Sequence, residues 1–231
     1  MGGRTMNATA YDTLKTHYAK DWGRAVNHRF VNELVSDRLD DKTLRGYLIQ
    51  DWQFSYDFYS LMGEAIATAD TMSAKVRLGQ QLGFIANDEN SYFHERFRQL
   101  NGRESERLST ELTPASAGFR KLYRQTVDAH SYAQALAVLV VAESMYLDWA
   151  EERTAHGTSM PEKAQNVGWV EVHRGEDFTE WVDFLIEEFN RVADPENDDV
   201  ADCFANAVHY ELGFFDDAYA WEDGTDKVIR G

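Results

Sequence analysis

Three acidic residues lie in helical patterns whose other positions are apolar. Glu143 belongs to the run ALAVLVVAESMYLDWA, residues 135–150, where the positions three, four and seven residues away are all apolar or aromatic. Asp51 and Glu211 have similar surroundings at the same spacings in two other segments. Burial of an ionised carboxylate is costly unless the group is paired or hydrogen-bonded. Each of these acids therefore needs either a partner or a chemical role.

A single buried acid has an ordinary structural explanation, because it is more often bonded to an arginine, a tyrosine hydroxyl or a helix N-terminus than used in catalysis. Three acids on three segments, without matching arginines or lysines on the same stripes, favour one polar site inside a bundle. Neighbouring carboxylates in an apolar pocket have raised and separated pKa values, so that one can donate a proton and another can accept one near neutral pH. The pattern therefore predicts acid–base chemistry.

The segments around these acids also carry aromatic residues, namely Tyr47, Phe54, Phe58, Phe119, Tyr146, Phe214 and Phe215. Taken singly, each ring is expected to pack in the core. If the acids line a cavity, some of the rings must form its walls, and a flat heteroaromatic ligand would stack between them. Acids that bond to ring nitrogens and amino groups between aromatic walls describe a pocket for an aminopyrimidine.

The elements that position these residues are predicted to be helices. The three prolines each lie beside a polar break, and apolar residues recur at spacings of three and four. The predicted helices cover 9–35 with a break near Asn27 and His28, Asp40 or Asp41 to near Asp70, Ser73 to about Leu100, Thr113 to about His130, Ser131 to Gly157, about 176–193, and 196–221. Residues 157–175 are expected to be looser.

No linker, repeat or change in composition divides the chain, so we predict one helical domain over 9–221, with a flexible N-terminus at 1–8 and a C-terminal tail at 222–231. The formal net charge of -17 argues against nucleic acid and anionic membranes as partners. Cys203 is the only cysteine, and no apolar stretch is long enough to span a bilayer. A cytoplasmic location is therefore expected.

Four stretches resemble, in the same order, the TenA or thiaminase II family: LRGYLIQDWQFSYDF, YAQALAVLVVAESMYLDWAEE, WVEVH and YELGFFDDAYAW. The similarity extends from about residue 10 to 221. It implies an all-α, haem-oxygenase-like bundle that assembles as a homo-oligomer, a dimer or a tetramer. Carried over to this chain, the resemblance implies that Asp51 holds the pyrimidine amino group and ring nitrogen. It further implies that Glu211 is the glutamate of the closing motif, that Phe214 is a ring wall and that Phe119 stacks on the substrate.

The chain departs from that family at the position of its nucleophile. The Pro-Cys pair of the family falls on Val141 and Ala142, so the thiol is absent. The sequence is similar to the branch in which a glutamate beside the lost cysteine takes over, and Glu143 fits that description. In addition, Phe54 and His173 stand where the family has tyrosines. These departures count against thiaminase activity, which needs a nucleophile at the pyrimidine methylene.

We therefore predict a hydrolase that acts without a cofactor on an aminopyrimidine, such as 4-amino-5-aminomethyl-2-methylpyrimidine or its N-formyl form, in thiamin salvage. The predicted catalytic residues are Glu143 and Glu211. The predicted substrate-binding residues are Asp51, Tyr47, Phe54, Phe119, Tyr146, His173 and Phe214.

Two other functions stay open. A haem-oxygenase-like di-iron oxidase would use Glu143, His173, Asp177 and Glu180, with His94 as a further candidate ligand. The set is incomplete, because the expected H-x-x-x-D-x-x-H pattern ends in a glutamate here and Asn87 stands seven residues before His94. The main prediction therefore includes no metal. The second alternative is a non-catalytic ligand-binding or regulatory homologue.

Overall fold

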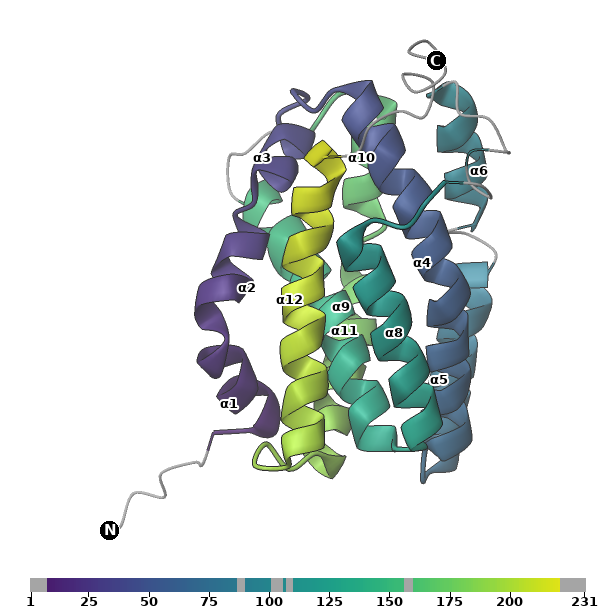
Figure 1. Cartoon of the computed structure of the whole chain (residues 1–231), viewed down its shortest axis with the longest axis vertical. Helices are drawn as coiled ribbons and strands as arrows, with labels where there is room; N and C mark the ends of the chain where they lie inside the picture. Colours follow the sequence, from purple (N-terminus) through teal and green to yellow (C-terminus); the bar gives the residue numbers. More distant parts are fainter. Residues whose placement is uncertain (1–7, 87–89, 101–105, 107–109, 156–159, 221–231) are drawn as a thin grey trace.

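The helix α9 (Tyr132–Thr154) lies at the centre of the structure. Every residue from 135 to 141 is fully buried, as expected for a helix that is hydrophobic on all sides. Four long helices pack around it: α4 (Asp41–Thr68), α8 (Pro114–Ala129), α11 (Glu176–Val192) and α12 (Asp198–Ala220). They run along the long axis of the molecule, so the arrangement is an all-helical bundle (Figure 1).

The computed structural model describes residues 8–86, 90–100, 106, 110–155 and 160–220. Within these ranges the regular elements are helices, as predicted, and none of them is long and apolar enough to cross a membrane. The predicted flexible N-terminus at 1–8 and the C-terminal tail at 222–231 lie outside the described residues, apart from residue 8.

The N-terminal segment forms three helices rather than one or two: α1 (Ala10–His17), α2 (Ala19–Val26) and α3 (Arg29–Val35). The predicted break at Asn27 and His28 is confirmed, and the His28 imidazole caps α3 by accepting a hydrogen bond from the Phe30 amide. A second break falls at Tyr18, whose backbone leaves the helical region without any proline or glycine to mark it. Sequence analysis missed this break because the apolar spacing continues across it.

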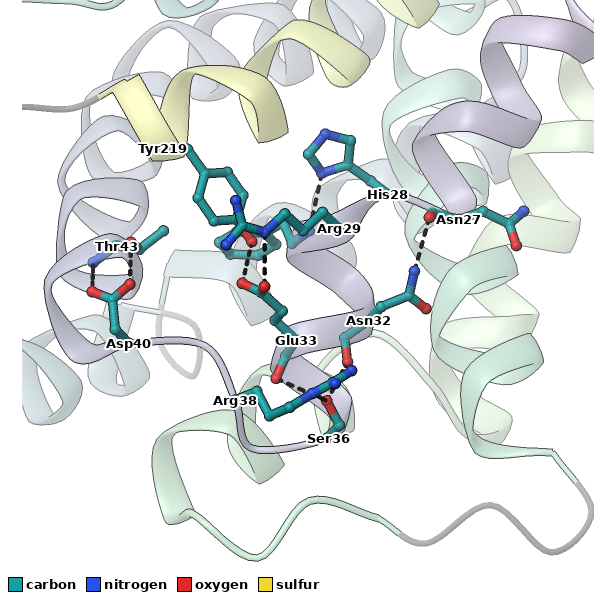
Figure 2. Close-up of polar contacts among 11 residues, drawn as sticks. Asn27, His28, Arg29, Asn32, Glu33, Ser36, Arg38, Asp40, Thr43 and Tyr219 are labelled. Atoms are coloured by element: carbon teal, nitrogen blue, oxygen red, sulfur yellow. Dashed lines mark hydrogen bonds and ion pairs between the residues drawn. The ribbon is translucent and has the colours of Figure 1, made fainter.

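Polar contacts connect α3 to α12, the helix that carries Glu211 (Figure 2). The Glu33 carboxylate accepts hydrogen bonds from Arg29 Nε and from the Tyr219 hydroxyl, each at 2.7 Å. The Arg29 guanidinium also lies over the Tyr219 ring, 4.4 Å from its centroid. Near the same end of the bundle, Asp40 caps α4 by accepting the Thr43 amide at 2.9 Å. Two of the three helices that carry the predicted acids, α4 and α12, therefore have polar contacts at this end of the bundle.

The segment predicted as one helix from Ser73 to Leu100 contains two, α5 (Met72–Phe84) and α6 (Asn90–Gln99), and residues 87–89 lie outside the described part. Both helices pack against α4. Apolar residues at helical spacing continue in each half, so periodicity alone could not separate them. Gly79 and Gly83, which are weak helix formers, precede the end of α5.

A further helix, α10 (Ala164–Glu171), lies within the stretch predicted to be loose. Its N-terminus is capped from far away in sequence, because the Asp37 carboxylate accepts hydrogen bonds from the Glu162 and Lys163 amides and from Asn166 Nδ2. Although burial favours the neutral acid, these hydrogen bonds hold the pKa of Asp37 below its ordinary value. A cap supplied more than a hundred residues away leaves no local signal in the sequence.

The contact between α8 and α12 is close at Gly118. A Cβ atom at this position would lie 2.3 Å from Cε1 of Tyr210. We therefore expect Gly118→Ala to lower the free energy of unfolding by about 1–3 kcal/mol, the usual cost of overpacking. Equilibrium unfolding in urea measures this change.

Gly63→Ala is the matched control, because Gly63 lies inside α4 with nothing within 4 Å of the added Cβ. This variant is expected to be more stable by up to about 1 kcal/mol, from helix propensity alone. An equal increase in the free energy of unfolding in both variants would show that the α8–α12 contact is not tight at Gly118.

Candidate active site

A cavity of about 110 Å³ lies among six helices, and the three acids singled out in the sequence all line it. This volume is of the same order as the roughly 150 Å³ of an apolar cavity that binds benzene. The lining residues are Asp51, Phe54, Ser55 and Phe58 of α4; Gln81 and Phe84 of α5, and Ile85; Ala142, Glu143 and Tyr146 of α9; Trp169 of α10, with Val172 and His173 after it; Phe178 of α11; and Glu211 and Phe214 of α12.

The three acids reach the cavity from three different helices. Asp51 and Glu211 are buried, whereas Glu143 is half-buried. Each residue lies on the apolar stripe of its helix, and the packing of α4, α9 and α12 turns the three stripes toward the same space. The periodicity indicated which way each acid faces along its own helix. The convergence of the three is a property of the packing.

The protonation of Glu211 is strongly affected by its surroundings. Burial first, and then the negative charges of Asp51 and Glu143, raise the pKa of Glu211 well above the ordinary value for a glutamate. Interactions of this kind require that the carboxylates lie close to one another. The site therefore favours a protonated Glu211, able to donate a proton, beside carboxylates able to accept one.

A pair of tyrosines adds hydroxyl groups that can donate hydrogen bonds. The Tyr146 ring lines the cavity, and its hydroxyl is hydrogen-bonded to that of Tyr47, which lies behind it and not in the lining. Burial, followed by the nearby Tyr47, Glu211 and Asp51, raises the pKa of Tyr146 well above its usual value. Tyr146 therefore keeps its proton and can act as a hydrogen-bond donor.

The His173 ring has a defined protonation pattern. Its Nδ1 lies 2.8 Å from the Trp169 carbonyl oxygen, which can only accept, so Nδ1 carries the proton and Nε2 is an acceptor. Burial lowers the pKa of His173 to about 4, against the opposing effect of that hydrogen bond. The imidazole is therefore neutral at physiological pH, and it packs between the Tyr146 and Trp169 rings.

Not every predicted substrate-binding residue reaches the cavity. Phe54 and Phe214 line it, but Phe119 does not, and packs behind Phe54 with 5.1 Å between ring centroids. Several lining residues were missed by sequence analysis: Gln81 and Phe84 of α5, Trp169 of α10 and Phe178 of α11. The sequence did contain an indication for Trp169, since this residue stands four residues before His173 in the WVEVH stretch. It contained no such indication for Gln81, Phe84 or Phe178.

The ligands of the di-iron alternative are not brought together. Glu143 and His173 face the cavity, whereas Asp177 and Glu180 are exposed on α11 and His94 is exposed on α6. Asn87, the residue seven positions before His94, lies outside the described residues. Within the described part of the chain, no group of three or more His, Cys, Asp or Glu residues is arranged to hold a metal ion.

Two other buried acids of α4 have ordinary structural partners. The Asp57 carboxylate accepts hydrogen bonds from Arg120 Nε at 2.6 Å and from Arg124 Nε at 3.3 Å. Glu64 lies 3.1 Å from Nδ1 of His130. Neither residue lines the cavity. The acids of the cavity thus differ from the structural acids in position, although all of them occupy buried stripes.

The bundle and its acidic, aromatic-walled cavity define a class of all-helical proteins with a pocket enclosed among the helices. A model of the TENA/THI-4/PQQC family matches residues 17–220, and the chain belongs to this family. No match was found among curated protein sequences.

Several solved structures share the fold. A TenA homologue from P. horikoshii OT3 superposes with a TM-score of 0.82 at 17% identity, covering 92% of this chain and 99% of that one. A TenA family transcription regulator from Silicibacter sp. TM1040 gives 0.80 at 16% identity, covering 91% and 96%. A TenA-like protein from Sulfolobus solfataricus P2, proposed to be a thiaminase, gives 0.77 at 13% identity, covering 93% and 97%.

The raised pKa of Glu211 predicts how stability depends on pH. The folded protein binds the Glu211 proton more tightly than the unfolded chain, so this residue lowers stability as pH rises above about 4.3, the ordinary value for glutamate. Glu211→Gln removes the titration. We expect the variant to gain stability relative to the wild type as pH rises above about 4.3, measured by thermal unfolding at a series of pH values.

Glu188→Gln provides a control of opposite sign. The ion pair with Arg191 lowers the pKa of Glu188, against the effect of burial, so its contribution is present above about pH 4.3 and is lost as pH falls. This variant is expected to be less stable than the wild type at pH 7 and to approach it in acid. A Glu211→Gln variant that behaves in the same way would contradict the assignment of Glu211 as a protonated acid.

Proposed function

We propose that the protein is an aminopyrimidine aminohydrolase that acts on pyrimidines from thiamin degradation. The observation that carries this proposal is the meeting of Asp51, Glu143 and Glu211 in one aromatic-walled cavity. Membership of the TENA/THI-4/PQQC family supports a small-ring substrate. Ala142 stands where the nucleophilic cysteine of the family is expected, so hydrolysis by activated water replaces attack by a thiolate.

Asp51 is proposed to fix the orientation of the ring. Its carboxylate would accept a hydrogen bond from the exocyclic amino group, beside the ring walls Phe54 and Phe214. Aromatic walls favour a flat ring and keep out bulk water, which strengthens the electrostatic interactions of the carboxylates. The Tyr146 hydroxyl and His173 Nε2 would supply a donor and an acceptor at the side of the cavity that is formed by α9 and α10.

The proposed reaction divides proton transfer between two glutamates. Glu143 accepts a proton from water as the water oxygen bonds to the exocyclic methylene carbon. The carbon–nitrogen bond breaks, and the leaving nitrogen takes the proton of Glu211 and departs as ammonia. The proton on Glu143 then returns to Glu211, so that the acids are restored. With the N-formyl substrate, water would add to the formyl carbon and formate would be released.

The roles of the two glutamates follow from their burial. Glu211 is almost completely buried, at 2% exposure, and its raised pKa suits a proton donor. Glu143 is half-buried and is the acid best able to contact a water molecule that enters with the substrate. Two carboxyl groups whose environments separate their proton affinities are the usual arrangement for paired acid and base catalysis.

Glu143→Gln tests the proposal directly. The amide has the size of the acid but cannot accept a proton, so we expect kcat for deamination or deformylation to fall by about 10²–10⁴-fold, the usual contribution of a general base. The measurement is turnover of thiamin, the aminopyrimidine and its N-formyl form, each with the wild type and with the variant.

Glu64→Gln is the matched control, because Glu64 is a buried glutamate of the bundle that does not line the cavity. It should keep full turnover. Wild-type rates in Glu143→Gln would remove the proposed role of Glu143. Binding of the pyrimidines without turnover by the wild type would favour the non-catalytic alternative.

A further inference from the structure

Tyr123 of α8 is a buried tyrosine whose hydroxyl makes no hydrogen bond to any described residue. The side chain is 1% exposed. A buried hydroxyl without a partner is less favourable than one that is hydrogen-bonded. Phenylalanine would fill the same space without that cost, so the hydroxyl calls for an explanation other than packing.

The Tyr123 ring lies directly behind the wall of the cavity. Its centroid is 5.2 Å from that of Phe54 and 6.2 Å from that of Phe58, and both of these residues line the cavity. Phe119, one turn earlier on α8, packs against both Tyr123 and Phe54, with centroid distances of 5.5 Å and 5.1 Å. Tyr123 therefore borders the site without lining the cavity itself.

Carboxylates are the main charges around this hydroxyl. Burial, followed by the charges of Glu211, Glu143, Asp51 and Asp57, raises the pKa of Tyr123 well above its usual value. The Asp57 oxygens already accept hydrogen bonds from Arg120 and Arg124. The packing of α8 against α12 brings Tyr123 and Glu211 to the same region: Phe119, one turn before Tyr123, contacts Phe214, one turn after Glu211, with ring centroids 6.4 Å apart. Glu211 is therefore the cavity acid to which the Tyr123 hydroxyl is best placed to donate, in line with its effect on the pKa of Tyr123, the largest after that of burial.

We propose that Tyr123 is a positioning residue for Glu211, and that its hydroxyl donates a hydrogen bond, directly or through one water molecule, to the Glu211 carboxylate once that group has lost its proton. This inference rests on the proposed function for its role in catalysis. The contact itself concerns only the two side chains and can be tested without a substrate.

The timing of this hydrogen bond would favour the reaction. While Glu211 is protonated and uncharged, a hydrogen bond from Tyr123 to it would be weak, and the Tyr123 hydroxyl stays unpaired. When Glu211 gives its proton to the leaving nitrogen, a negative charge develops in an apolar space, and a hydrogen bond to a charged group is stronger than one between neutral groups. An interaction that strengthens as the reaction proceeds raises kcat rather than substrate affinity.

The first experiment follows the ionisation of Glu211 in the whole protein without substrate. The infrared band of the protonated Glu211 carboxyl group is identified by its absence in Glu211→Gln, and its loss is then followed with increasing pH. Tyr123→Phe should move the midpoint upward by about one pH unit, a tenfold change in proton affinity, because the anion loses a donor. Tyr146, His173, Asp51 and Glu143, the other titratable groups of the cavity, are unchanged in this variant.

Tyr219→Phe is the control, because its hydroxyl bonds to Glu33 outside the cavity. It should leave the Glu211 midpoint unchanged. Tyr123→Phe is expected to fold with an equal or higher melting temperature, since it removes an unpaired buried hydroxyl. An unchanged midpoint in Tyr123→Phe would overturn the proposal.

The second experiment measures kcat and KM for the pyrimidine that the wild type turns over fastest. Tyr123→Phe should lower kcat about tenfold and leave KM unchanged. Tyr219→Phe should leave both kcat and KM unchanged. An unchanged kcat in Tyr123→Phe would overturn the catalytic role of the contact. If the wild type turns over none of the pyrimidines, the proposed function fails, and the infrared midpoint still decides whether Tyr123 supports the Glu211 anion.

Discussion

Mutual repulsion among three carboxylates in an apolar cavity is the interaction on which the rest of the site depends. Asp51, Glu143 and Glu211 cannot all be ionised at low cost in such a space, so one of them holds a proton. Glu211, the most buried of the three, has a pKa raised well above the ordinary value for a glutamate. Burial therefore supports the proposal that Glu211 donates a proton and that the less buried Glu143 accepts one.

This arrangement requires that α9, the helix that carries Glu143, is held in a fixed position. On the side away from the cavity, Ser144 accepts a hydrogen bond from the Tyr11 hydroxyl at 3.0 Å. One turn further along, Asp148 accepts hydrogen bonds from Lys15 at 2.6 Å and from the Trp22 indole at 2.8 Å. These contacts tie α1 and α2 to the helix that carries Glu143. Precise placement of a catalytic group depends on support of this kind.

Much of the fold could be predicted from local signals. The polar caps at Asp40, Thr113 and Ser131 and the apolar spacing located the long helices, because capping and amphipathicity act within one or two turns. The break between α5 and α6 and the existence of α10 were missed. The cap of α10 is Asp37, which is distant in sequence, and no local pattern carries that information.

The sequence by itself determined which residues occupy buried stripes, since side-chain direction on a helix follows from its period. It also indicated that acids and rings share those stripes and that the family's cysteine is replaced. Only the tertiary structure decided that three stripes face one cavity, that Phe119 and Tyr47 stand behind its wall, and that Gln81, Phe84 and Phe178 complete it. These outcomes depend on how helices pack around α9, and packing is set by contacts among residues far apart in the chain.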